Sequence, residues 1–174
     1  IRYQDETPPT PKALAERLAP LLKGRPQRLL MEPGRALVGE AGWLLTRVES
    51  LKPGHRDFAI VDAAMNDLLR PALYDAWQRI ETVESSTAEP RLYDIVGPVC
   101  ETADSLGKGR SLALEPGALL AIHGAGAYGF VMASQYNARP RAAEVLIDGS
   151  EAHLVRERET LDNLWQGEHL LTSS

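Results

Sequence analysis

The sequence predicts a mainly β fold with some helix, in the form of a β-barrel or a β-sandwich. After Arg35, strand-like apolar runs recur at short intervals, and glycine or proline separates most of them. One pair of runs is joined by Asp148-Gly149, and both residues tolerate the positive φ of a hairpin turn. Many short strands with turn signals between them are typical of barrels and sandwiches.

The first 35 residues follow a different pattern of strand, helix and strand. Residues 1–3 are strand-like, and Thr10 can cap a helix that has Pro11 at its favoured first position. The apolar run RLLMEP, residues 28–33, predicts a buried strand. Such a βαβ unit cannot close a sheet or a barrel alone, so we expect the chain to be a fragment whose missing strands precede its first residue.

The remaining residues, 36–174, predict strands with two helical interruptions. The helical pieces are residues 68–78 and 161–166. The strand-like runs are residues 43–51, 57–63, 79–84, 91–99, 111–115 and 118–126, followed by the hairpin over 142–158. The change of pattern near Arg35 therefore predicts two units, residues 1–35 and residues 36–174.

Composition argues against several kinds of partner and site. The formal net charge of -5 argues against nucleic acid, and no apolar run approaches the length of a membrane span. Cys100 is the only cysteine, which leaves no internal disulfide and fits the reducing cytoplasm. The four histidines have no metal-ligand spacing with Cys100 or with one another, so we expect no metal site.

The single cysteine lies in the stretch VGPVCETAD, from Val96 to Asp104. Glu101 follows Cys100 directly, and Gly97-Pro98 shapes the backbone just before them. A thiol beside a carboxylate after a rigid turn is a candidate functional pair. The alternative is that Cys100 is a small buried hydrophobe, as most free cysteines are.

A second candidate is the segment Glu32-Pro33-Gly34-Arg35, at the carboxyl end of a predicted parallel strand. Proteins of α/β type place their sites at such ends. Gly34 lets backbone amides approach an anionic group, and Arg35 adds a charged fork for carboxylate or phosphate. An ordinary strand-to-helix turn is the alternative.

Arg70 and Tyr74 form a third candidate because they are four residues apart in NDLLRPALYDAW. If Pro71 opens a helix, the guanidinium and the phenol lie on roughly the same side and could grip a carboxylate together. The alternative is a surface arginine beside a core tyrosine.

The segment GAGAYG, residues 124–129, matches G-x-G-x-x-G after a strand-like run. A dinucleotide site would need a helix to follow, but FVMASQYNARP leans towards strand and is then broken by asparagine and proline. We therefore expect no dinucleotide site, and expect instead a glycine-lined strand end that presents Tyr128 to a ligand.

Five segments together resemble the carboxyl-terminal part of the diaminopimelate decarboxylases, which belong to the alanine-racemase-like, pyridoxal-phosphate-dependent decarboxylases. The segments are LLMEPGR, FAIVDAAMNDLLRPALYDAW, YDIVGPVCETAD, GAGAYGFVMASQYNARPRAAEVL and LDNLWQGE. They occur in the family's order and cover essentially the whole chain. No single segment is specific, but the combination is.

This resemblance implies an architecture. Such enzymes have an amino-terminal (β/α)8 barrel that holds the cofactor and a carboxyl-terminal β-barrel domain, Greek-key-like in its connections. Residues 1–35 would be the last helix and strand of the first barrel, and residues 36–174 the second barrel with a terminal helix. The resemblance also implies a homodimer with active sites at the subunit interface.

The resemblance further implies roles towards the cofactor, pyridoxal 5'-phosphate. Glu32 would face the pyridine nitrogen and keep it protonated, which strengthens the electron sink. Gly34 and Arg35 would contact the cofactor phosphate, and Arg35 also the substrate. Tyr128 would contact both cofactor and substrate.

For the substrate, the resemblance implies meso-2,6-diaminopimelate, converted to L-lysine and carbon dioxide. Arg70 and Tyr74 would hold the distal carboxylate, and Glu101 the distal ammonium. Cys100 would reach into the neighbouring subunit's site and protonate the carbon that loses carbon dioxide. A relative acting on ornithine or lysine has no distal carboxylate to bind, so Arg70 and Tyr74 favour diaminopimelate.

The chain departs from the family because the Schiff-base lysine and the glycine-rich phosphate loop would precede Ile1. None of its four lysines, Lys12, Lys23, Lys52 and Lys108, lies in the family's context. We therefore expect this chain alone to be inactive. The alternatives are a non-catalytic dimerisation or regulatory module of the same fold, or a related basic amino acid decarboxylase.

Overall fold

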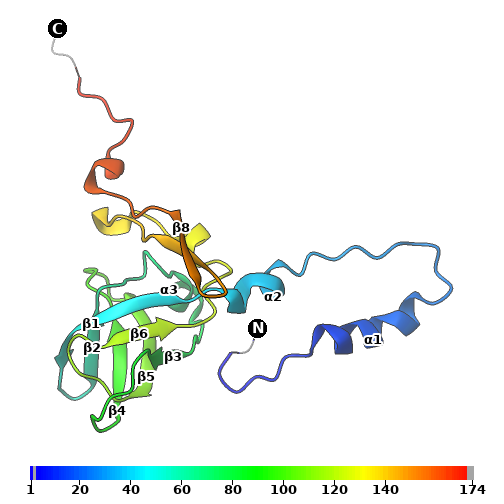
Figure 1. The fold of residues 1–174 in the computed structure, drawn as a ribbon, viewed down its shortest axis with the longest axis horizontal. Helices are drawn as coiled ribbons and strands as arrows, with labels where there is room; N and C mark the ends of the chain where they lie inside the picture. Colours follow the sequence, from blue (N-terminus) through cyan, green and yellow to red (C-terminus); the bar gives the residue numbers. More distant parts are fainter. Residues whose placement is uncertain (2, 172–174) are drawn as a thin grey trace.

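Six strands form one strongly curved sheet in the computed structural model, which describes residues 1 and 3–171. They are β1 (Leu44–Lys52), β2 (Asp57–Val61), β3 (Ile80–Thr82), β4 (Arg91–Val96), β5 (Ser105–Leu112) and β6 (Leu119–Ile122). Their order across the sheet is β3-β6-β1-β2-β4-β5. The outer strands β3 and β5 come together, since a Cβ on Gly107 of β5 would lie 2.8 Å from Cδ1 of Ile80 in β3. The sheet is thus a nearly closed barrel (Figure 1), so the mainly β prediction is confirmed as a barrel.

The strand directions decide which loops share an end of this barrel. Strands β2 and β4 are parallel, whereas β1 is antiparallel to both β2 and β6. It follows that β2, β4 and β6 all run the same way and end at the same rim. Strand β1 runs the opposite way and begins there. We call this end of the barrel the site rim.

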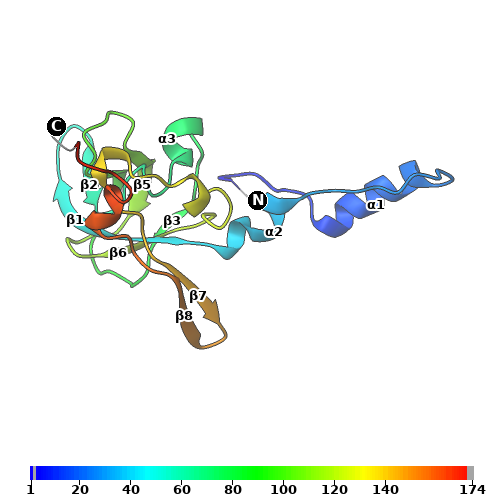
Figure 2. The ribbon, with the colours of Figure 1, turned by 90° about the horizontal axis from the view of Figure 1, so that it is seen from above.

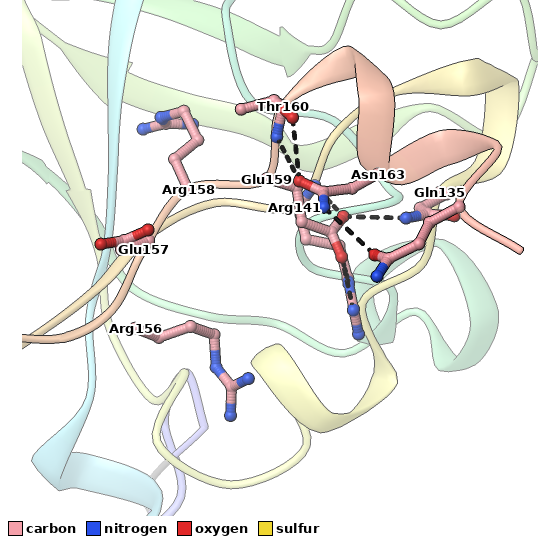
Figure 3. A pocket seen from close by; sticks show the side chains of 9 residues that line it. Gln135, Arg141, Arg156, Glu157, Arg158, Glu159, Thr160 and Asn163 are labelled. Atoms are coloured by element: carbon pink, nitrogen blue, oxygen red, sulfur yellow. Dashed lines mark hydrogen bonds and ion pairs between the residues drawn. The ribbon is translucent and has the colours of Figure 1, made fainter.

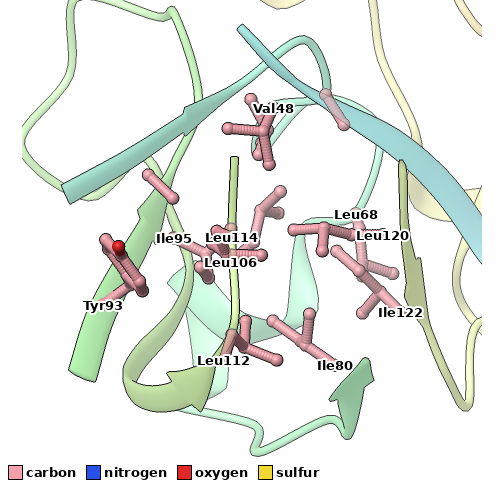
Figure 4. Packing of buried hydrophobic residues seen from close by; sticks show 13 residues of the cluster. Val48, Leu68, Ile80, Tyr93, Ile95, Leu106, Leu112, Leu114, Leu120 and Ile122 are labelled. Carbon is pink, nitrogen blue, oxygen red and sulfur yellow. The ribbon is translucent and has the colours of Figure 1, made fainter. Parts of the chain in front are cut away.

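The barrel interior is filled by aliphatic side chains from every strand (Figure 4). Val48, Ile95, Leu106, Leu120 and Ile122 are all fully buried, and they come from β1, β4, β5 and β6. Side chains alternate inward and outward along β4, where Tyr93 and Ile95 are buried and Leu92 is exposed. The core therefore holds the rim loops on a rigid frame.

Truncating a core side chain should cost much of the domain's stability. We expect Leu120→Ala to lower the free energy of unfolding by about 2–5 kcal/mol, the usual cost of a cavity at a fully buried leucine. Leu92→Ala removes the same atoms from an exposed site and should change it by about 0.5 kcal/mol or less. Urea denaturation followed by circular dichroism measures both, and equal losses would contradict the expectation.

Not every predicted strand has the predicted bounds. The strand expected at residues 111–115 is wrong, because β5 occupies Ser105–Leu112 and contains Gly107 and Gly109, which the sequence pattern predicts as turn residues. Gly107 packs where the barrel closes and has no room for a side chain. Gly109 adopts a φ of +61° and donates its N–H to Oδ1 of Asp94 at 2.7 Å. Gly107 thus allows a close approach within the barrel, and Gly109 allows a positive φ within a strand.

The amino-terminal segment confirms the predicted helix and contradicts the strand predicted at residues 28–33. Helix α1 spans Pro11–Leu22, and Oγ1 of Thr10 accepts a hydrogen bond from the N–H of Ala13 at 3.1 Å. Ile1, Tyr3 and residues 28–33 have no regular structure, and Arg2 lies outside the described residues. A buried parallel strand needs hydrogen-bonded neighbours, and no described strand pairs with residues 28–33. Helix α1 lies apart from the barrel, at the end of a long extended connection (Figures 1 and 2).

Helix α2 (Gly34–Val38) and the 3-10 turn η1 (Gly39–Ala41) lead into β1, and helix α3 (Arg70–Tyr74) follows β2. The 3-10 turns η2 (Phe130–Met132) and η3 (Tyr136–Ala138) follow β6. The predicted hairpin is confirmed as β7 (Glu144–Asp148) and β8 (Glu151–Arg156), with Gly149 at a φ of +60° in the turn, and it projects from the barrel (Figure 2). The predicted terminal helix is the 3-10 turn η4 (Leu161–Leu164). None of the helices in the described part of the chain is long and apolar enough to span a membrane.

Candidate active site

The site rim carries five of the candidate residues that the sequence singles out. Arg70 and Tyr74 follow β2, Cys100 and Glu101 follow β4, and Tyr128 follows β6. The segment that contains Glu32, Gly34 and Arg35 leads into β1, which begins at the same rim. Strand direction therefore brings three segments that are far apart in the sequence to one end of the barrel, and the chain that follows residues 32–35 enters β1 at this end.

Arg70 lies between two aromatic rings at this rim. Its Cζ is 5.2 Å from the ring centroid of Tyr74 and 5.5 Å from that of Tyr128. Pro71 at the start of α3 gives the four-residue spacing its predicted geometry. Within the described residues, no carboxylate lies within ion-pair distance of the Arg70 guanidinium. A charged fork held by two π faces, with no acid partner among those residues, is suited to an anionic ligand.

A groove of about 640 Å³ opens beside Arg70 and Tyr74. Its other wall is formed by residues 3–6, which approach from the amino-terminal segment. Tyr3 in that wall also accepts a hydrogen bond from Nη1 of Arg35 at 3.3 Å. Tyr3 thus lines the same groove as Arg70 and Tyr74 and also contacts Arg35.

The turn after β4 exposes its central residues and buries its ends. Cys100 and Glu101 are exposed, whereas Val99 and Asp104 on either side are buried. The interpretation of Cys100 as a buried hydrophobe is therefore wrong. Oε1 of Glu101 accepts from the N–H of Ala103 at 3.2 Å, so the carboxylate is oriented by its own turn.

Tyr128 is presented by the glycine-rich loop in a left-handed conformation, with a φ of +60°. The preceding Gly126 packs flat on the entry to β1, since a Cβ there would lie 2.0 Å from the carbonyl oxygen of Val38 and 2.7 Å from N of Gly42. The glycines therefore allow one backbone to pack against another. The short 3-10 turns η2 and η3 follow residue 129, as the sequence pattern against a helix predicts.

Glu32, Gly34 and Arg35 are all exposed, and their chemistry fits the two ends of a pyridoxal phosphate. A carboxylate suits the protonated ring nitrogen, and a guanidinium suits the phosphate. A Cβ on Gly34 would meet nothing within 4 Å, which leaves open space beside the backbone. In the part of the chain that the structure describes, no cluster of three or more His, Cys, Asp or Glu side chains could hold a metal ion.

Sequence reasoning missed a tyrosine and a buried asparagine at this rim. The hydroxyl of Tyr136 donates to Oε2 of Glu101 at 3.4 Å. Asn66 is 2% exposed and holds the loop of Tyr136, because its Nδ2 donates to the carbonyl oxygen of Ser134 at 3.2 Å and its Oδ1 accepts from Nε of Arg139 at 3.0 Å. No local sequence signal indicates these contacts, because they join segments that are far apart in the sequence.

A polar pocket of about 500 Å³ lies beside the base of the hairpin, and none of the candidate residues lines it (Figure 3). Two of its charged groups pair with each other, since Nε of Arg141 donates to Oε1 of Glu159 at 2.8 Å, and Arg156 pairs with Glu144. The Arg141 side chain and its N–H, together with Gln135, lower the pKa of Glu159 from its ordinary 4.5 to about 2. The ion pair between Arg141 and Glu159 therefore holds the two ends of the hairpin together.

This ion pair predicts a pH dependence of stability. Because the folded-state pKa of Glu159 is depressed, its contribution is present above about pH 4.5 and is lost as the pH falls towards 2. We expect wild-type protein to be more stable than Glu159→Gln at pH 6, with the difference vanishing near pH 2. Thermal unfolding across this range measures it. Glu157→Gln, an exposed neighbour, is the control, and a difference that persists at pH 2 would contradict the assignment.

The barrel and its rim can now be compared with known protein families. The model of the family described as "Pyridoxal-dependent decarboxylase, C-terminal sheet domain" matches residues 15–126, and the chain belongs to this family. Several diaminopimelate decarboxylases are among the proteins that it resembles. The resemblance drawn from the five sequence segments is thereby confirmed.

The curated diaminopimelate decarboxylase of Pseudomonas aeruginosa is 58% identical over 172 residues, which cover 98% of this chain and 41% of that protein. The crystal structure of diaminopimelate decarboxylase from M. jannaschii matches with a TM-score of 0.93 and 37% identity, covering 98% of this chain and 41% of that one. That of the Helicobacter pylori enzyme complexed with L-lysine matches with a TM-score of 0.88 and 40% identity, over 95% and 41%. The chain therefore spans about two fifths of the length of these relatives.

Proposed function

We propose that this chain is the carboxyl-terminal part of an enzyme that decarboxylates meso-diaminopimelate to L-lysine and carbon dioxide. In this proposal residues 1–35 belong to an amino-terminal (β/α)8 barrel and residues 36–174 form the second domain. The exposed apolar side chains of Leu21, Leu29 and Leu30 support this division, because they would be buried against such a barrel.

The observation that carries the proposal is the Arg70 guanidinium between Tyr74 and Tyr128, which has no acid partner among the described residues. Diaminopimelate has an amino acid group at each end, so the end that does not react needs a cationic and an anionic anchor. Arg70 and the Tyr74 hydroxyl supply the first, and Glu101, steadied by Tyr136, supplies the second. A decarboxylase of diamine-forming type would need only the anionic anchor, so this pair favours diaminopimelate over ornithine or lysine.

The cofactor, pyridoxal phosphate, supplies the electron sink that lets a carbon–carbon bond to carbon dioxide break. Glu32 would hold the proton on the ring nitrogen, and Arg35, with the backbone at Gly34, would bind the phosphate and help bind the substrate. Tyr128 would contact cofactor and substrate from the glycine-rich loop. Cys100 would deliver a proton to the carbon that has lost carbon dioxide, in the site of the neighbouring subunit of a homodimer. Exposure of both Cys100 and Glu101 supports a site completed by another chain.

The experiment is carbon dioxide release from meso-diaminopimelate with added pyridoxal phosphate. The full-length enzyme of this proposal should release carbon dioxide and L-lysine stoichiometrically, and the 174-residue chain alone should not. Turnover by the 174-residue chain at equal concentration would refute the requirement for the amino-terminal barrel. No turnover by a folded, dimeric full-length protein would refute the decarboxylase and leave a dimerisation or regulatory module.

A further inference from the structure

The turn that presents Cys100 is held by one buried carboxylate. Asp104 is 4% exposed, and both of its carboxylate oxygens accept backbone hydrogen bonds. Oδ2 accepts from the N–H of Val99 at 2.8 Å, and Oδ1 accepts from the N–H of Met65 at 2.7 Å. The N–H of Asp104 itself donates to the carbonyl oxygen of Glu101 at 3.0 Å. One side chain therefore fixes both ends of the exposed turn.

The two backbone groups bound by Asp104 belong to different parts of the rim. Val99 directly precedes Cys100, whereas Met65 lies in the segment between β2 and the helix of Arg70. Burial makes these hydrogen bonds costly to lose, because an unpaired N–H would have no water to replace the carboxylate. Asp104 thus ties the thiol turn directly to the segment that carries the arginine.

Gly97 shows how closely the turn is seated on that segment. A Cβ at Gly97 would lie 2.4 Å from Oδ2 of Asp104 and 2.7 Å from the carbonyl oxygen of Ala63. The carboxylate occupies the space that any side chain at position 97 would need. Gly97 therefore leaves room for the Asp104 carboxylate, in addition to its part in the bend of the backbone with Pro98.

We propose that Asp104 is a positioning residue that sets the placement of Cys100 and Glu101 relative to the Arg70 segment. The kinetic part of this inference rests on the proposed decarboxylase function, whereas the structural part concerns the turn alone. Asp104 acts only through the residues it positions, since its carboxylate is buried and both of its oxygens are occupied by backbone donors.

Asp104→Asn tests this because asparagine keeps the shape and loses one acceptor. Its amide nitrogen would face the N–H of Val99 or Met65, so one hydrogen bond becomes a contact between two donors. Asp94→Asn is the matched control: Oδ1 of Asp94 also accepts a backbone N–H, that of Gly109 at 2.7 Å, but within the β4–β5 pair and away from the turn. If Asp104→Asn fails to fold, Asp104→Ser keeps one acceptor oxygen and leaves room for a water.

The kinetic test uses the full-length enzyme, with variants confirmed as folded by thermal unfolding. We expect Asp104→Asn to lower kcat about 10- to 100-fold, as expected for a catalytic group displaced by around 1 Å. Asp94→Asn should lower it less than about 2-fold, because this carboxylate contacts Gly109 and Arg56 and neither belongs to the turn. In a Cys100→Ala background, Asp104→Asn should lower kcat by a much smaller factor, because its effect on the proton donor is already lost and only its effect through Glu101 remains. An equal loss in both backgrounds would overturn the proposal and leave the decarboxylase standing.

A second test does not depend on turnover. Cys100 is exposed, so its alkylation by iodoacetamide can be followed at the level of its own peptide by mass spectrometry. We expect Asp104→Asn to change the alkylation rate several-fold and Asp94→Asn to leave it unchanged. Equal rates in all three proteins would overturn the proposal. A changed rate in a protein that releases no carbon dioxide would support the positioning of the turn and refute only the proposed reaction.

Discussion

Replacing Cys100 by alanine lowers kcat for decarboxylation of diaminopimelate by about 100- to 10,000-fold, if the full-length enzyme uses this thiol as its proton donor. The expectation follows from geometry. Cys100 is exposed at the tip of a turn whose ends are buried, so its thiol can enter a site that its own barrel does not enclose. Alanine removes the donor and leaves the backbone hydrogen bonds of the turn in place.

The matched control is Thr102→Ala, an exposed change in the same turn. It should leave kcat within about 2-fold, since isolated surface substitutions rarely disturb a fold. Steady-state carbon dioxide release at saturating diaminopimelate measures both variants. Full activity in Cys100→Ala would remove the thiol from its role while keeping the decarboxylase, and equal losses in both variants would assign the effect to the turn as a whole.

The sequence signals for the candidate site are mostly local. The spacing of Arg70 and Tyr74 needed only one turn of helix begun by Pro71, and the structure places the guanidinium over the Tyr74 ring. Tyr128 could not be joined to that pair from the sequence, because its position depends on β6 running the same way as β2. Strand direction across a sheet is a long-range property that local patterns do not contain.

The failed predictions have the same origin. Residues 28–33 read as a buried strand because their apolar run is strand-like, but a strand forms only where neighbours supply hydrogen bonds. Gly107 and Gly109 looked like turn residues, yet they lie within β5 at a barrel closure and at a positive-φ irregularity. Local patterns also could not indicate that Asp104 is buried and bound to two backbone N–H groups. In each case tertiary packing decided the outcome.

Replacing Arg70 by glutamine should weaken binding of ligands that keep the non-reacting carboxylate and spare those that lack it. L-lysine retains that carboxylate after the other end has reacted, whereas cadaverine does not. Loss of a charge-assisted hydrogen bond corresponds to about 1.5–3 kcal/mol, or about 10- to 150-fold in affinity. We expect a loss of this size for inhibition by L-lysine and in kcat/KM for diaminopimelate, with inhibition by cadaverine changed less than about 2-fold.

Two further variants make this test specific to the cationic anchor. Arg91→Gln removes an arginine that begins β4, at the end of the barrel opposite the site rim, and should change none of the three quantities. Tyr74→Phe keeps the ring that lies 5.2 Å from the Arg70 guanidinium and removes only the hydroxyl, so it separates ring support from hydrogen bonding. An equal loss of affinity for L-lysine and cadaverine in Arg70→Gln would show that the arginine shapes the groove but does not bind the carboxylate. A loss of affinity confined to L-lysine would mean that the Arg70 guanidinium, between Tyr74 and Tyr128, distinguishes an amino acid end from a simple amine. A diaminopimelate decarboxylase requires this discrimination, whereas a diamine-forming relative does not.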